Sequence, residues 1–258
     1  MKRIKTYMVH SFVGKGLKGS PACVIILNKW LSDSELKEIS AKNAVPETVF
    51  VLSQENRFEI RWFTPEIEMD LCGHATLAAA HILFEKKTVK SNSFAFSSPS
   101  GDLEIENHNG ILFMKFPIRP PVPAPCPQII IESLSIKPKE IHKSRDYILV
   151  YDSEEDIINI DVDQEKLNTI NIDPGGICLT ARGKDCDFVS RFFTPQASIF
   201  EDPVTGSAHC SLVPYWSKRL GIKKMHAKQC SKEGGELFCE QTKNHIIIGG
   251  RAQTISST

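Results

Sequence analysis

The feature that most constrains the fold is a pattern that the chain contains twice. The first copy is RWFTP at residues 61–65, followed by DLCGHATL at residues 70–77. The second copy is RFFTP at residues 191–195, followed by EDPVTGSAH at residues 201–209. The two Phe-Thr-Pro triplets lie 130 residues apart in a chain of 258, which is far longer than the repeat of common solenoids. The pattern therefore predicts a duplicated domain, in which a strand ends at proline and a glycine opens an apolar helix.

Each copy places a glycine, Gly73 or Gly206, at the predicted start of its helix. The first turn of a helix has unpaired N–H groups and a partial positive charge, and glycine allows a ligand to approach the backbone closely. Two such helix ends facing each other across a domain cleft would bind a small molecule that carries a carboxylate. The alternative is that both stretches are merely helix starts, and the repetition favours a function in binding.

Composition excludes several classes of protein. Lys+Arg and Asp+Glu both number 31, which argues against a dedicated nucleic-acid binder. No apolar run approaches the roughly 20 residues that span a bilayer, and no signal peptide is recognisable at residues 1–5. The eight cysteines include no C-x-x-C pair, so we expect reduced thiols rather than disulfides or a zinc site. These observations predict a cytoplasmic protein with no membrane or nucleic-acid partner.

The periodicity of apolar residues predicts two α+β halves of similar plan. The segment 117–127 contains six prolines in eleven residues, which excludes a helix or a central strand. We therefore predict a first domain at 1–117, a linker at 118–127 and a second domain at 128–258. Whether the last residues pack back on the first domain is left open.

The predicted elements follow from local patterns. A capping box at Ser32 begins a helix that ends near Lys42. The other predicted helices are 74–85, 137–142 and 206–220, and the predicted strands are 5–13, 22–27, 48–52, 58–63, 94–96, 103–106, 111–116, 147–151, 177–181, 188–193, 236–240 and 246–248.

Three motifs together resemble the PhzF-like phenazine-biosynthesis isomerase family: PETVFV at 46–51, CGHAT at 72–76 and EDPVTGSAH at 201–209. The resemblance extends over essentially the whole chain. It implies a fold like that of diaminopimelate epimerase, with two pseudo-symmetric domains. Each domain is a mostly antiparallel, barrel-like sheet around a central helix, and the active site lies between the domains. It also implies a cofactor-independent isomerase that moves a proton within a small carboxylic acid, and commonly a homodimer.

The resemblance assigns roles to particular residues. Glu47 becomes the acid/base that takes and returns the proton, although the preceding residue, often Ser in the family, is here Pro46. His74, Asp202 and Ser207 match positions that assist proton transfer and substrate binding.

The same resemblance places the substrate against the two glycines that open the helices. The amides of Gly73 and Gly206 would contact it, and Cys72 and Thr205, the residues before them, belong to the same binding set.

Each candidate also has a simpler structural role. A Glu at a strand start is usually solvated, but Glu47 lies between a proline and an apolar strand, so we expect partial burial and a raised pKa. For His74 the helix N-terminus disfavours imidazolium, which predicts a neutral ring. Asp202 and Ser207 could serve as helix-terminal charge and cap.

Three alternatives to the single-base isomerase remain open. A two-base racemase needs a thiol before each glycine, and Cys72 has no counterpart because Thr205 holds the second position. Cys210 lies too far into the helix to replace it. The stretch DPGGIC at 173–178, which corresponds to the Glu47 region, has no acid at the matching strand start.

The second alternative is a cysteine nucleophile at Cys72, for which no separate His motif supplies a base. The third is a binding module without turnover. No phosphate-loop or dinucleotide motif and no metal-ligand spacing is present, so we predict no cofactor and no metal.

Overall fold

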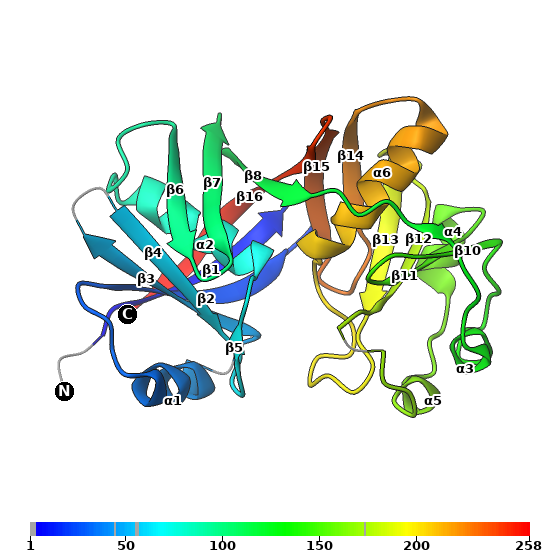
Figure 1. Cartoon of the computed structure of the whole chain (residues 1–258), viewed down its shortest axis with the longest axis horizontal. Coiled ribbons are helices and arrows are strands. Elements are labelled where there is room, and N and C mark those ends of the chain that lie inside the picture. Colours follow the sequence, from blue (N-terminus) through cyan, green and yellow to red (C-terminus); the bar gives the residue numbers. More distant parts are fainter. Residues whose placement is uncertain (1–3, 44, 55–56, 173) are drawn as a thin grey trace. The chain divides into compact units, whose positions relative to one another are not determined.

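The computed structural model describes residues 4–43, 45–54, 57–172 and 174–258. They form two compact units (Figure 1). The first consists of the described residues up to Lys115 together with Gly249–Thr258, and the second is Phe116–Ile248. The last residues of the chain, whose packing the sequence left open, thus belong to the first unit. Among the described residues, no helix is long and apolar enough to cross a membrane.

The first part of the chain is built mainly from strands. These are β1 (Thr6–Val13), β2 (Ser20–Leu27), β3 (Glu47–Gln54), β4 (Arg57–Phe63), β5 (Glu68–Met69), β6 (Ser93–Ser98), β7 (Gly101–His108) and β8 (Ile111–Pro117), with helices α1 (Asp33–Asn43) and α2 (Gly73–Glu85). The segment between the predicted strands 48–52 and 58–63, where the sequence QEN at residues 54–56 favours a turn, includes residues 55–56, which lie outside the described residues.

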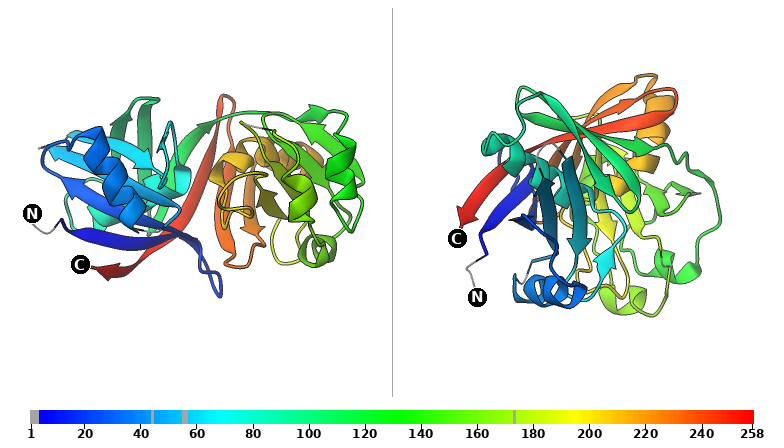
Figure 2. Two further views of the ribbon diagram at one scale, coloured as in Figure 1. Left: turned by 90° about the horizontal axis from the view of Figure 1, so that it is seen from below. Right: turned by 60° about the vertical axis from the view of Figure 1, so that its left-hand side comes forward.

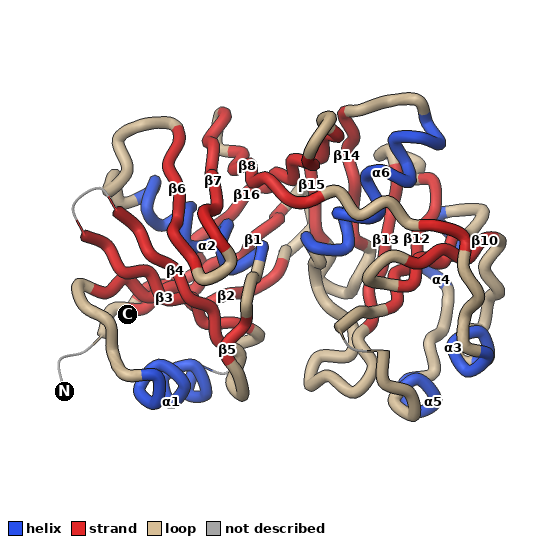
Figure 3. Tube along the Cα trace, viewed as in Figure 1, coloured by secondary structure: helices blue, strands red, loops and turns tan. Residues whose placement is uncertain are grey.

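The strands of the first unit close into a ring. Their order is β1-β2-β3-β4-β6-β7-β8-β16, and β16 (His245–Ser257) pairs back with β1 in antiparallel orientation. The first and last strands of the chain therefore run side by side (Figure 2). Helix α2 lies among these strands (Figure 3). Its side chains are buried along nearly all its length. A hydrogen bond of 3.0 Å from Trp62 Nε1 to Thr76 Oγ1 fixes α2 to β4.

The second part of the chain repeats this plan. Its strands are β9 (Val122–Pro123), β10 (Glu140–Lys143), β11 (Tyr147–Val150), β12 (Ile177–Arg182), β13 (Phe188–Phe193), β14 (Lys224–Gln229) and β15 (Gly235–Gln241), and its helices are α3 (Gln128–Glu132), α4 (Glu154–Asn159), α5 (Gln164–Leu167), the 3-10 turn η1 (Gly206–Ala208) and α6 (His209–Leu220).

Strand pairing shows the duplication directly. In the first unit β2 and β3 are parallel, β3 and β4 antiparallel, and β4 and β6 parallel across α2. In the second unit β11 and β12 are parallel, β12 and β13 antiparallel, and β13 and β14 parallel across η1 and α6. Other pairs, among them β1–β2, β1–β16, β6–β7, β7–β8 and β14–β15, are antiparallel, as expected for a mostly antiparallel sheet.

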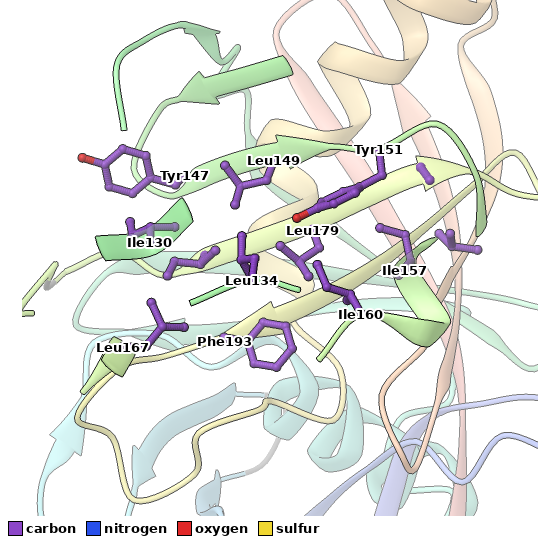
Figure 4. Close-up of a cluster of buried hydrophobic side chains, with 13 residues drawn as sticks. Ile130, Leu134, Tyr147, Leu149, Tyr151, Ile157, Ile160, Leu167, Leu179 and Phe193 are labelled. Carbon is purple, nitrogen blue, oxygen red and sulfur yellow. The ribbon is translucent and has the colours of Figure 1, made fainter. Parts of the chain in front are cut away.

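Strands β11 and β12 are covered on both faces. Leu149 and Leu179 belong to a cluster that also contains Ile130 and Ile157 from the short helices α3 and α4 (Figure 4). On the other face of β12, Thr180 Oγ1 accepts a hydrogen bond of 2.9 Å from Trp216 of α6. Burial on both faces explains the continuous apolar runs in these strands.

The helix predicted at residues 137–142 is wrong. This segment contains β10, which pairs with β11 in antiparallel register from Glu140↔Val150 to Lys143↔Tyr147. The Glu140 carboxylate also binds Arg219 and Tyr215 of α6, at 2.6 and 3.0 Å. Sheet pairing and these contacts outweigh the weak local preference for a helix. The elements that were not predicted from the sequence are β5, β9, β14, α3, α4 and α5.

The repeated Arg-aromatic-Phe-Thr-Pro motif has a structural role. Arg61 binds both carboxylate oxygens of Glu68 at 2.6 Å, and Arg191 binds those of Glu201 at 2.7 and 2.9 Å. Each arginine thus links the end of a strand to the loop that leads into a central helix. The motif positions the two helix starts without forming part of them.

Replacement of a side chain on the central helix should destabilise the first unit. Leu77 on α2 is fully buried, so Leu77→Ala should lower the free energy of unfolding by about 3 kcal/mol through lost burial and a residual cavity. Urea unfolding monitored by tryptophan fluorescence measures the change. The control Ile158→Ala, on a side chain that is 56% exposed, should change it by less than about 0.5 kcal/mol.

Candidate active site

Glu47 is placed by the sheet at the first position of β3, where it pairs with Ala22 of β2. The neighbouring residue is held from α1, because Asn43 Nδ2 donates a hydrogen bond of 3.1 Å to Thr48 Oγ1. His74 is the second residue of α2, and its carbonyl accepts a hydrogen bond of 2.7 Å from Ser11 of β1. Three strands and two helices therefore fix the positions of these residues.

Glu47, His74 and Cys72 form one buried cluster. His74 Nε2 lies 2.9 Å from Glu47 Oε2, and the two side chains are 9% and 16% exposed. Cys72 Sγ lies 3.5 Å from Nδ1 and 3.9 Å from Nε2 of the same imidazole. Although Oε2 approaches His74 closely, it makes no aligned hydrogen bond to any described residue. The attraction between opposite charges is therefore a main part of the contact between Oε2 and His74.

The charges in this cluster differ from those expected from the sequence. Burial disfavours the carboxylate of Glu47, but the charge and close contact of His74 and the thiol of Cys72 outweigh it and lower the pKa below 4.5. Burial likewise disfavours the imidazolium of His74, but Cys72 and Glu47 raise its pKa well above 6.5. The expectations of a raised pKa for Glu47 and a neutral His74 were wrong, because each group stabilises the charge of the other.

The start of α2 offers amide donors to a ligand. Cys72, the residue before the helix, makes no side-chain cap hydrogen bond to the described part of the chain. The first turn, GHAT at residues 73–76, contains no acid. By contrast, Ser153 and Asp163 cap α4 and α5 through their side chains. The amides at Gly73 therefore keep their capacity to bind a negative group.

The second unit contains the other predicted residues in one segment. Asp202 Oδ2 accepts a hydrogen bond of 2.7 Å from Thr205 Oγ1, and Oδ1 accepts one of 3.2 Å from the Val204 amide. Gln229 Oε1 accepts the Thr205 amide at 2.8 Å. Asp202 thus orders the loop that leads to Gly206. As at α2, the helix start at η1 lacks a side-chain cap from the described residues.

The duplication identifies the counterpart of Glu47. Thr48 pairs with Phe63, and Ile177 pairs with Phe193 in the repeated strands, so Gly176 occupies the position equivalent to Glu47. A Cβ at Gly176 would lie 2.3 Å from the ring of Phe192, so this position has no room for a side chain. Asp173, in the stretch compared from the sequence, lies outside the described residues.

Sequence reasoning missed two charged residues beside the second helix start. Arg145 Nη2 donates a hydrogen bond of 3.0 Å to Ser207 Oγ, and Asp146 pairs with this arginine through both oxygens at 3.1 Å. The only signal in the sequence is the Arg-Asp dipeptide at the start of a predicted strand, which is too common to indicate a site.

Three donor atoms that could hold a metal ion also meet here. Oxygen, sulfur and nitrogen atoms of Glu47, Cys72 and His74 lie within 4.8 Å of one another, a proximity that motif spacing did not indicate. A metal requires the thiolate and the neutral imidazole. Burial, followed by the Glu47 charge, raises the pKa of the Cys72 thiol. Because the pKa of His74 is also raised, a metal would have to displace two protons.

The ionisation of the cluster is testable by NMR titration of the histidine rings. His74 should titrate well above pH 6.5, whereas burial lowers the pKa of His209 to about 4 and makes it an internal control. Glu47→Gln should lower the pKa of His74, because the variant lacks the Glu47 charge that helps to stabilise the imidazolium against the effect of burial. A His74 pKa that stays unchanged in this variant would show that Glu47 does not stabilise the imidazolium.

Known proteins are similar to this chain both in sequence and in fold. A family model described as phenazine biosynthesis-like protein (PhzC-PhzF) matches residues 9–257. An uncharacterized isomerase of Pseudomonas aeruginosa is 39% identical over 246 residues, which cover 95% of this chain and 94% of that protein. A crystal structure of a phenazine biosynthesis protein of the PhzF family from Enterococcus faecalis has a TM-score of 0.94 and 39% identity, covering 98% of this chain and 97% of that one.

A more distant structure, a predicted epimerase of Pseudomonas aeruginosa, has a TM-score of 0.72 at 18% identity and covers 99% of this chain and 98% of that one. At this identity it shows the fold alone. Together, these structures confirm the α+β, epimerase-like fold class predicted from the sequence.

Proposed function

Because this chain belongs to the phenazine biosynthesis-like (PhzC-PhzF) family, we propose that it is a cofactor-independent isomerase that moves a proton within a small carboxylic acid. The observation that carries the proposal is the buried contact of 2.9 Å between Glu47 and His74. It provides a carboxylate that is ionised at neutral pH next to a protonated acid. Both lie beside a helix start that has no side-chain cap from the described residues.

In this reaction the Glu47 carboxylate removes a proton from a C–H group of the substrate. The electron pair of that bond moves into the conjugated system of the acid, and the proton returns to a different carbon, so that no net oxidation occurs. The lowered pKa of Glu47 keeps the base ionised but weakens it. The His74 imidazolium and the amides at Gly73 offset this weakness, since they stabilise the negative charge that develops on the substrate.

The residues of the second unit are proposed to bind the acid. Their roles come from the family resemblance and are supported by local structure: the start of η1 lacks a side-chain cap from the described residues, and Asp202 and Thr205 order the loop before it. In this proposal Ser207 and the Gly206 amide contact the substrate. Homodimerisation and a cytoplasmic location stay predictions.

One observation favours a second candidate function, a cysteine nucleophile. The sequence indicated no base for Cys72, but His74 Nδ1 lies 3.5 Å from its sulfur. The Glu47 carboxylate contacts Nε2 of the same imidazole at 2.9 Å. This is the order of groups in a Cys-His-carboxylate triad. Burial and the Glu47 charge raise the pKa of the Cys72 thiol, however, which opposes formation of the reactive thiolate. We therefore favour the isomerase.

Removal of the base should abolish proton transfer without unfolding the protein. We would incubate a panel of cyclic and acyclic unsaturated acids in D2O, including 2,3-dihydro-3-hydroxyanthranilate, and follow deuterium incorporation by NMR. The wild type should exchange one substrate, and Glu47→Gln should lower that rate by at least about 100-fold, as expected for loss of a general base. Circular dichroism would check the fold of the variant.

The cysteine variant separates the two candidate functions. Cys72→Ser should retain exchange under the isomerase proposal, because the thiol is not the base. Exchange that survives Glu47→Gln and disappears in Cys72→Ser would instead identify a thiol base. Absence of exchange in the wild type with every acid would favour a binding protein without turnover.

A further inference from the structure

At equivalent positions of the repeat, the second residue of each helix start contacts a group of different charge. Aligning the glycines that open the helices places Ser207 at the position of His74. In the first unit the group that contacts this position is the Glu47 carboxylate, at 2.9 Å. In the second unit it is the Arg145 guanidinium, at 3.0 Å. The duplication has thus placed a base at one helix start and a cation at the other.

Arg145 is held in a fixed orientation by a buried acid. Its Nε and Nη2 donate to the two oxygens of Asp146, both at 3.1 Å, and the Asp146 side chain is only 2% exposed. The same carboxylate accepts the Gly176 amide at 3.0 Å. Gly176 occupies the position that is equivalent to Glu47 in the first unit. Asp146 therefore contacts the backbone at the position where the second unit has no glutamate.

The arginine still has donors to offer a ligand. Nε and Nη2 are used by Asp146 and Ser207, but Nη1 makes no hydrogen bond to any residue within the described ranges. The Arg145 side chain is 29% exposed, so a small molecule can reach it. Ser207 Oγ accepts from Arg145, and a hydroxyl that accepts can donate its own proton elsewhere. Guanidinium and hydroxyl donors together suit a carboxylate.

The surroundings of this pair favour an anion. Arg119 lies beside α6, since its amide donates a hydrogen bond of 3.0 Å to the Cys210 carbonyl, and its guanidinium has no ion pair within the part of the chain that the structure describes. Burial raises the pKa of the Cys210 thiol to about 11, and Arg119 and Arg145 both oppose this rise. The nearby acid Asp202 is engaged with Val204 and Thr205.

We propose that Arg145 and Ser207 bind the carboxylate of the substrate, with Asp146 acting as the positioning residue for Arg145. This inference rests on the proposed function, because a small carboxylic acid is the class of substrate proposed there. It goes beyond the sequence motifs, which contain neither Arg145 nor Asp146.

The test is equilibrium binding of benzoate, a simple carboxylate, compared with the neutral benzamide, measured by ligand-observed NMR. The wild-type protein should bind benzoate and discriminate against benzamide. Arg145→Gln should weaken benzoate binding by at least about tenfold, since a charge-assisted hydrogen bond is lost. The matched control is Arg182→Gln, which removes an arginine of the same unit that is 52% exposed, and it should leave binding unchanged.

A second variant guards against misfolding, because Arg145→Gln leaves the buried Asp146 without its partner. In Arg145→Gln/Asp146→Asn the buried charge is also removed, so the fold is retained and benzoate binding should still be weak. Wild-type affinity in this double variant would overturn the proposal and give Arg145 a purely structural role. Equal binding of benzoate and benzamide by the wild type, or binding of neither, would also overturn it.

The binding assay is independent of turnover, so the two proposals fail separately. If deuterium exchange survives Glu47→Gln while Arg145→Gln loses benzoate, the base assignment is wrong and the carboxylate site stands. If Glu47→Gln abolishes exchange while Arg145→Gln binds benzoate as tightly as the wild type, only the proposed carboxylate site is wrong.

Discussion

A charge inside a protein needs a partner of opposite sign, and two such pairs lie next to the helix starts of this chain. Removal of a carboxylate from water is strongly unfavourable unless a cation or several donors replace the lost solvent. Glu47 meets this requirement with His74, and Asp146 meets it with Arg145 and a backbone amide. Each pair fixes one reactive group next to a helix start, and the strands and helices around it serve to keep it there.

The duplicated fold allows two similar halves to place different charged groups at equivalent positions. The order of parallel and antiparallel pairs is the same, and an arginine at the end of each long hairpin holds the loop before each central helix. The side chains around the helix starts differ, among them Ser207 in place of His74 and, at the neighbouring strand start, Gly176 in place of Glu47. Divergence at these positions changes the charge of a site without disturbing the core, because the frame is built from residues elsewhere.

The sequence predicted what depends on local patterns and missed what depends on tertiary contacts. The repeat, the family resemblance and most strands could be read from it, because alternation and turn residues are local signals. The segment 137–142 was misread, since pairing with β11 decides its structure. The pKa directions of Glu47 and His74 depend on residues 27 positions apart that only the fold brings together. Arg145 carries no motif, so its contact with Ser207 could not be found from sequence.

The path of β16 has a consequence for how the protein is made. This strand closes the ring of the first unit, yet it is the last strand of the chain, and its partner β1 is the first. During synthesis the second unit can assemble while the first unit still lacks its closing strand. The ring that surrounds α2 is therefore completed only when Gly249–Thr258 have left the ribosome. If translation stops before these residues, the edge of β1 that pairs with β16 stays exposed to strands of other molecules.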